Sequence, residues 1–336
     1  MNQFKTLTID EVCDRLAEKK KTLIIFHVRP DADAIGSAFA LRAILVNMGI
    51  PAVCACSDEV PDRLRFLMEP AQGSVVPEEG MEMDHERVIA VDSASPQQLG
   101  EIFTRLRRDV HLMIDHHGMG TQYADGYIDP EASATGEIIY TLACRLVERG
   151  ALAAIPHSAL SAIYAAICSD TGSFRFANAT PKTFRTVANL LEAGVEGDEI
   201  CRNLYESKSQ KQIRAEGEAA RRLMVHDGGL FASTTLPHTS IYSLGLSAEH
   251  METAIDIPRS LAGVEVAFAI RQPEQAGIFR VSMRSNGAVD VSRICAKFGG
   301  GGHKRASGCT VEAAHIDDAE DMILNAVREE WKKTRT

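Results

Sequence analysis

Short apolar runs alternate with stretches of helical periodicity over the first part of the chain. Four runs have the length of buried strands, at residues 23–26, 52–56, 87–91 and 110–114. Apolar residues at helical spacing predict helices at residues 7–20, 36–48, 133–150, 158–167 and 181–194. Ser133 or Thr135 is the expected N-cap of the third of these helices. This alternation predicts an α/β fold with a mainly parallel sheet flanked by helices.

The pattern changes after a charged and polar run at residues 206–222, which we interpret as a solvated linker helix. Strand-like runs separated by Gly/Pro turns follow at residues 230–236, 264–271 and 277–284. A short helix at 289–298 and a terminal helix at 317–333 complete the chain. We therefore expect a first domain at 1–195, a linker region at 196–222 and a smaller α/β domain at 223–336.

Ionisable side chains follow three strands of the first domain, each at the C-terminal end. Parallel strands bring these ends to one edge of the sheet, which is where open α/β sheets bind ligands. A further Asp follows the buried helix at 158–167. The candidates are His27, Asp31, Asp33, Asp92, Asp115, His116, His117 and Asp170.

These residues have two interpretations. Asp31 and Asp33 could cap a helix, and Asp92 or Asp170 could each belong to a turn. Imidazole and carboxylate ligands together favour Mn, Fe, Co or Zn over Ca or Mg. There are more candidates than one ion uses, and four carboxylates balance the charge of two divalent ions. A water between two such ions becomes a nucleophile near neutral pH.

Composition restricts the class of partner. The formal net charge is −10, which argues against binding of long duplex nucleic acid but allows a phosphorylated ligand in a local positive pocket. No apolar run is long enough to span a membrane, and the N-terminus lacks the pattern of a signal peptide. The eight scattered cysteines form no CxxC pair, so we expect reduced thiols and a cytoplasmic protein.

A run of four glycines at residues 299–302 precedes His303, Lys304 and Arg305. It is either a flexible tip or a bare backbone that lets a phosphate approach the amide groups. It is not a Walker A loop, because neither Ser nor Thr follows the Lys. Arg284, next to Ser285 at a strand end, is either solvated or a bidentate clamp for an anion.

These motifs resemble those of the DHH phosphoesterases. The first domain resembles their four motifs in order, and Arg284-Ser285 with the GGGH run resembles their C-terminal DHHA1 domain. The size and the two-domain layout resemble the oligoribonuclease/pAp-phosphatase branch of nanoRNases. The matching segments are His27-Val-Arg-Pro-Asp31-Ala-Asp33, Asp92, Asp115-His116-His117 and Ser169-Asp170-Thr-Gly.

The resemblance implies a role for each residue. One metal would be held by His27, Asp31 and Asp92, and the second by Asp33, Asp92, His116 and Asp170. His117 would contact the scissile phosphate, Asp115 would orient a histidine, and Arg284 would act with His117 in catalysis by stabilising the developing charge. The substrate-binding set implied for the second domain is Arg284, Ser285, Gly301, Gly302, His303, Lys304 and Arg305.

We therefore expect a phosphohydrolase with two divalent ions, manganese first and magnesium or cobalt as alternatives. A hydroxide activated by both metals would cleave oligonucleotides of about two to five nucleotides to mononucleotides, and 3′-phosphoadenosine 5′-phosphate (pAp) to AMP. Linear or cyclic di-AMP, pyrophosphate and polyphosphate are alternative substrates within the same family. A nucleotide sensor without activity is the alternative from another class. The resemblance also implies a homodimer, and no membrane partner is expected.

Overall fold

The computed structural model describes residues 4–68, 72, 74–77, 85–106, 110–273 and 277–335. The chain divides into two compact units, Met1–Ser207 and Lys208–Thr336. Both are α/β, as the sequence predicts. Among the described residues, no helix is long and apolar enough to cross a membrane. All eight cysteines are free thiols.

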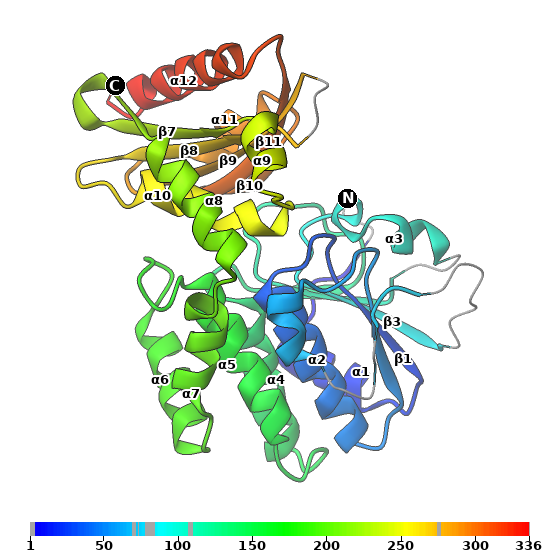
Figure 1. Ribbon diagram of the computed structural model, residues 1–336. Helices are drawn as coiled ribbons and strands as arrows, with labels where there is room; N and C mark the ends of the chain where they lie inside the picture. The colour runs from blue at the N-terminus through cyan, green and yellow to red at the C-terminus, as the bar shows by residue number, and fades with distance from the viewer. Residues whose placement is uncertain are drawn as a thin grey trace. The chain divides into compact units, whose positions relative to one another are not determined.

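The first unit is built on a five-stranded parallel sheet (Figure 1). All four predicted strands are present, and each pairs with its neighbours in parallel register. The fifth strand is only three residues long and was not predicted. In spatial order the strands are β2 (Ala52–Ala55), β1 (Thr22–Ile25), β3 (Arg87–Val91), β4 (Leu112–Asp115) and β5 (Gly126–Ile128).

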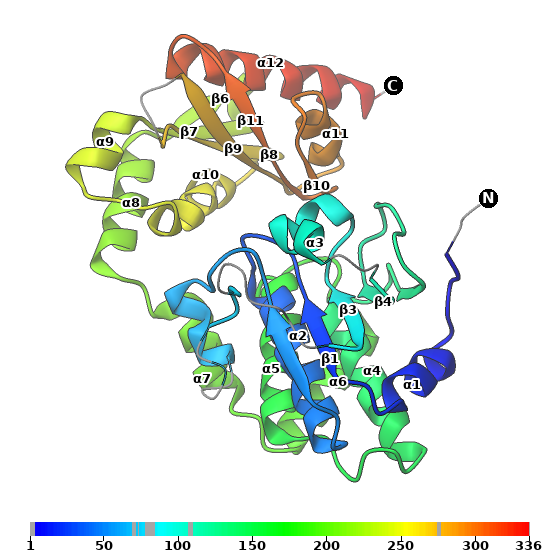
Figure 2. The ribbon, with the colours of Figure 1, turned by 90° about the vertical axis from the view of Figure 1, so that its right-hand side faces the viewer.

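Successive residues of the strands enter two different cores. Ile24 and Ile89 pack under the larger helical layer, whereas Leu23 and Val88 pack on the opposite face. Figure 2 shows this sheet with the main helices behind it. The larger layer contains α1 (Ile9–Ala17), α2 (Ala32–Asn47), α4 (Thr135–Glu148), α5 (His157–Asp170), α6 (Pro181–Glu192) and α7 (Gly197–Cys201). The short helices η3 (Pro96–Leu99) and α3 (Glu101–Arg105) cover the other face, and η1 (Asp62–Leu67) packs beside α2.

Several helix ends differ from the expected ones, and two of these differences involve a candidate site residue. Helix α2 begins at Ala32 rather than Gly36, because the Asp31 side chain caps it by accepting from the backbone N–H groups of Asp33 and Ala34. Helix α5 continues through Asp170. The N-cap of α4 is Ala134, so the expectation of Ser133 or Thr135 at that position was wrong.

The second unit has a six-stranded mixed sheet, in which only β7 and β8 pair in parallel. Helices α11 (Val291–Ala296) and α12 (Ile316–Lys333) pack on one face of it (Figure 2). The other face carries α8 (Gln210–Arg221), α9 (His238–Ser243), η6 (Glu249–Ile255) and α10 (Asp256–Arg259). In spatial order the strands are β10 (Gly301–His303), β11 (Ala306–Glu312), β9 (Ile278–Ser285), β8 (Val266–Arg271), β7 (Phe231–Leu236) and β6 (Met224–His226).

Two segments of the second unit differ from their expected structure. Helix α8 is not solvated on all sides, because Ala215 and Ala219 are fully buried in the second unit. The glycine run is not a free tip, because Gly301–His303 forms strand β10 and pairs with Ala306–Gly308 of β11. Glycine is required at Gly300, where a Cβ atom would lie 2.2 Å from the carbonyl oxygen of Gly308.

Candidate active site

The strand ends of the first unit bring the predicted residues together. Strands β1, β3 and β4 are neighbours, so their C-terminal ends meet at one edge of the sheet. Helix α2 supplies Asp33 from its first turn, and α5 supplies Asp170 from its last. Among the described residues of the first unit, the candidate ligand atoms form three groups, and the atoms of each lie within 4.8 Å of one another: His27, Asp31 and Asp92; Asp33, His116 and Asp170; and Asp92, Asp115 and His117.

Asp92 belongs to the first group and also lies close to the second. It presents one carboxylate oxygen to the histidine of each group. Its Oδ2 is 3.5 Å from Nε2 of His27, and its Oδ1 is 3.6 Å from Nε2 of His116. His27 Nε2 is also 3.7 Å from Oδ1 of Asp31. His116 Nε2 is 3.7 Å from Asp33 Oδ2 and 3.2 Å from Asp170 Oδ2. This is the arrangement that a carboxylate shared between two cations requires.

The donor spacing tests whether these residues fit metal ions. Two ligand atoms that bind one divalent ion at about 2.1 Å lie about 3.0 to 3.5 Å apart, depending on the angle between them. The distances from the two histidine nitrogens to the carboxylate oxygens are 3.2 to 3.7 Å, which is within this range or at most about 0.2 Å above it. The donor set is imidazole and carboxylate, which suits first-row divalent ions. The residues therefore fit a pair of divalent metal ions.

The pKa shifts of the buried side chains also favour a site for cations. Asp33 is fully buried, and burial together with the nearby Asp92 and Asp170 carboxylates raises its pKa well above the usual range. Burial acts to lower the pKa of His116, but the hydrogen bond to Asp170 and the surrounding carboxylates outweigh it and raise that pKa well above its usual value. In the metal-free protein, protons thus compensate an excess of buried negative charge. Metal ions would replace those protons.

Local hydrogen bonds and backbone conformation position three of the carboxylates. Asp31 is the N-cap of α2, so the helix-capping interpretation is correct for this residue and is compatible with the position of its Oδ1 near His27. Asp33 accepts a hydrogen bond of 2.8 Å from the Ser37 hydroxyl, one turn further along the helix. Asp92 has a left-handed backbone with φ of 51°, a conformation that Asp and Asn tolerate better than most residues.

Asp115 and His117 form a separate pair at the end of β4. Nδ1 of His117 is 2.7 Å from Oδ1 of Asp115, and the same oxygen accepts a 2.9 Å hydrogen bond from the backbone N–H of His116. Burial opposes protonation of His117, but the Asp115 contact raises its pKa. Asp115 therefore sets the orientation of the ring and directs Nε2 to the opposite side.

The predicted residues of the second unit lie along one end of its sheet. Arg284 on β9 pairs in register with Ala306 on β11, and the backbone N–H of Ser285 donates to the carbonyl oxygen of Arg305. Burial lowers the pKa of Arg284, and Asp256 partly offsets that effect. The side chain donates to the carbonyl oxygen of Met283. The remaining members of the set, which are all exposed, are Gly301, Gly302, His303, Lys304 and Arg305.

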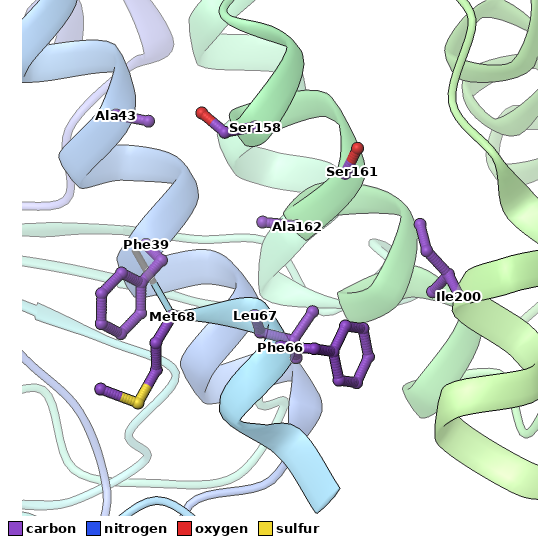
Figure 3. A pocket seen from close by; sticks show the side chains of 9 residues that line it. All are labelled: Phe39, Ala43, Phe66, Leu67, Met68, Ser158, Ser161, Ala162 and Ile200. Carbon is purple, nitrogen blue, oxygen red and sulfur yellow. The ribbon is translucent and has the colours of Figure 1, made fainter. Parts of the chain in front are cut away.

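A pocket of about 290 Å³ in the first unit lies among α2, η1, α5 and α7 (Figure 3). Its walls are apolar apart from Ser158 and Ser161, and none of the nine described residues that line it is ionisable. The pocket therefore offers no chemistry for hydrolysis. The reaction centre that the side chains support is the edge of the sheet instead.

Comparisons with known proteins identify two family domains in the chain. Residues 21–167 match the DHH family, N-terminal domain, and residues 233–332 match the DHHA1 domain. The chain is 32% identical over 309 residues to the bifunctional oligoribonuclease and PAP phosphatase NrnA of Thermus thermophilus, covering 91% of this chain and 89% of that protein.

A second relative and one solved structure extend the comparison. The cyclic-di-AMP phosphodiesterase GdpP of Geobacillus thermodenitrificans is 27% identical over 94% of this chain, which spans only 48% of that protein. The crystal structure of an exopolyphosphatase-related protein from Bacteroides fragilis superposes with a TM-score of 0.85 at 24% identity, covering 96% of this chain and 95% of the other. The chain therefore belongs to the DHH family and is a DHH-family phosphoesterase with a DHHA1 domain.

Proposed function

We propose that this phosphoesterase cleaves short oligoribonucleotides to mononucleotides and removes a phosphate from pAp to give AMP. The similarity to NrnA over nearly the whole chain supports this choice of substrates. The observation that carries the proposed chemistry is the position of Asp92, whose two carboxylate oxygens lie beside two separate groups of ligand atoms.

The residues divide into two proposed metal-binding sets that share Asp92. His27 and Asp31 complete the first set, and Asp33, His116 and Asp170 complete the second. Manganese is the ion we propose, with magnesium or cobalt as alternatives. When bound, two divalent ions would polarise the phosphate oxygens and lower the pKa of the attacking water.

His117 is the proposed contact to the scissile phosphate. Asp115 holds Nδ1 of its ring, so Nε2 lies on the side from which it reaches a phosphate oxygen. Water adds to phosphorus, the bond from phosphorus to the leaving nucleoside oxygen breaks, and that oxygen takes up a proton. Stabilisation of the charge that develops on the phosphate is the role we give to His117.

The second unit is proposed to bind the phosphate that is not hydrolysed. Arg284 supplies a guanidinium group, and the backbone of Gly301 and Gly302 lets a ligand approach closely. His303, Lys304 and Arg305 add donors and positive charge beside it. A larger ligand whose second phosphate is carried on a nucleoside, such as pAp or an oligonucleotide with a 5′-phosphate, offers more groups to such a set than pyrophosphate does.

Hydrolysis of cyclic di-AMP is the second candidate function, because GdpP is similar to 94% of this chain. Phosphate and nucleotide release with Mn²⁺ from pAp, a ribodinucleotide, cyclic di-AMP and pyrophosphate separates the candidates. Turnover of pAp and the dinucleotide supports the first proposal. Turnover of cyclic di-AMP alone favours the second, and turnover of pyrophosphate alone contradicts both. The homodimer stays a prediction that sedimentation of the full chain tests.

A further inference from the structure

The first turn of α4 contacts two of the buried carboxylates. The backbone N–H of Thr135 donates to Asp33 Oδ2 at 2.7 Å, and the N–H of Gly136 donates to Asp33 Oδ1 at 3.0 Å. Helix α4 is 14 residues long, and the positive end of its dipole faces the Asp33 carboxylate. None of these residues of α4 belongs to the predicted ligand sets.

The Thr135 side chain makes a separate contact with Asp92. Its hydroxyl donates to Asp92 Oδ1 at 2.9 Å, and the residue is fully buried. This hydroxyl does not cap the helix, because the N-cap is Ala134 and no side chain caps that end. A role in helix formation therefore does not explain a buried threonine hydroxyl at this position.

The contact selects one orientation of the shared carboxylate. Oδ1 of Asp92 faces His116, and Oδ2 faces His27. Rotation about the bond from Cβ to Cγ would move both oxygens away from these groups at once, and the bond from Thr135 opposes that rotation. A histidine nitrogen that binds a metal no longer donates a hydrogen bond to Asp92, whereas the Thr135 hydroxyl donates with or without metal.

We propose that Thr135 is a positioning residue, which sets how Asp92 is shared between two metal ions. This inference rests on the proposed two-metal function. Thr135 bonds the oxygen on the His116 side, so the ion bound by Asp33, His116 and Asp170 depends on it most. Partners that orient metal ligands typically contribute about 10-fold to 100-fold in metal affinity. We expect the loss of the hydroxyl to lower the binding affinity for one of the two ions by this factor and for the other by less.

The test is a titration of the metal-free full chain with Mn²⁺, in which calorimetry gives the number of ions bound and their affinities. Thr135→Val keeps the shape of the side chain and removes the donor. Thr135→Ser keeps the donor. Thr234→Val is the matched control, since Thr234 is a fully buried threonine whose hydroxyl donates only to a backbone carbonyl oxygen, that of Ala219, in the second unit.

We expect Thr135→Val to bind one Mn²⁺ nearly as the wild type does and the second about 10-fold to 100-fold more weakly. Thr135→Ser and Thr234→Val should bind both ions as the wild type does. The Mn²⁺ concentration for half-maximal activity should rise in Thr135→Val, with turnover recovered at high Mn²⁺. If Thr135→Val does not fold, Thr135→Ala compared with Thr135→Ser isolates the hydroxyl in the same way.

Two unchanged Mn²⁺ affinities in Thr135→Val would overturn the inference. So would an equal loss in Thr135→Ser, because the hydroxyl is still present there. A wild-type chain that binds no pair of Mn²⁺ ions gives a different result, since it overturns the proposed function as well. If only the positioning role fails, the wild type therefore binds two Mn²⁺ ions and Thr135→Val binds them with the same affinities.

Discussion

The two units of the chain prepare their candidate residues to different degrees. In the first unit, carboxylates from strand ends and helix turns accept hydrogen bonds from backbone N–H groups and hydroxyls, and their oxygens lie 3.2 to 3.7 Å from histidine nitrogens. In the second unit, the Arg284 side chain donates to the carbonyl oxygen of the adjacent Met283, and the glycine hairpin is exposed. The first unit therefore has a preorganised charge cluster, and the second presents donors that a ligand would complete.

The largest effect should follow from a change at the carboxylate shared by both metal sets. Asp92→Asn keeps a residue that tolerates the left-handed backbone but removes the charge that two ions would share. We expect loss of both Mn²⁺ ions and a fall in kcat/KM well beyond about 100-fold, since even partners of ligands cost about 10-fold to 100-fold.

The matched control for that change is Asp227→Asn. Asp227 has a left-handed backbone with φ of 48° as well, and its carboxylate pairs with Arg328 outside the cluster. Calorimetry with Mn²⁺ and steady-state assays of both variants are the measurements. Two Mn²⁺ ions in Asp92→Asn with normal turnover would remove the basis for a shared carboxylate.

A smaller loss of turnover should follow from Asp115→Asn. The change weakens the contact that orients His117 but leaves the two metal sets intact. We expect kcat to fall about 10-fold to 100-fold with both Mn²⁺ ions retained. Asp125→Asn is the control, because Asp125 pairs with Arg15 away from the cluster. A normal kcat in Asp115→Asn would show that His117 needs no support from this carboxylate.

Removal of Arg284 should affect binding rather than chemistry. A hydrogen bond to a charged group contributes about 1.5–3 kcal/mol, so Arg284→Ala should raise KM about 10-fold to 100-fold with kcat little changed. Arg280→Ala on the same strand is exposed and lies outside the predicted set, so it should behave as the wild type does. A loss confined to kcat would argue against a role in binding the second phosphate.

The smallest effect concerns the glycine hairpin. At Gly302, φ is 136° and a Cβ atom would lie 2.6 Å from the carbonyl oxygen of Ala306, so Gly302→Ala should destabilise the second unit by about 1–3 kcal/mol. Gly301→Ala is the control, since no described atom lies within 4 Å of the Cβ position there. The sole tryptophan, Trp331, belongs to α12 of this unit, so its fluorescence in a urea titration reports the effect. Equal unfolding midpoints would show that the hairpin tolerates a side chain at both positions.

The convergence of the first unit could be predicted from sequence because its signals are local. Strand β3 is an apolar run that ends directly at Asp92, and β4 leads directly into His116 and His117. Parallel pairing of neighbouring strands then requires these ends to meet at one edge. Apolar runs separated by Gly/Pro turns likewise predicted the strands of the second unit from β7 to β9.

The parts that sequence reasoning missed depend on contacts between distant segments. In the sequence, Thr135 is an ordinary residue for the start of a helix. Only the fold brings its hydroxyl to Asp92, 43 positions away. Strand β10 consists of two glycines and a histidine, so it lacks the β-branched residues that indicate a strand, and pairing with β11 determines it. The apolar pattern places the start of α2 four residues late, because the N-cap, Asp31, lies outside that pattern.

The most direct test of the central claim is a crystal structure of the full chain grown with Mn²⁺, with diffraction recorded at the manganese absorption edge. We expect two anomalous peaks, one beside His27 and Asp31 and one beside His116 and Asp170, with Asp92 between them. A single peak, or none at this edge of the sheet, would contradict it.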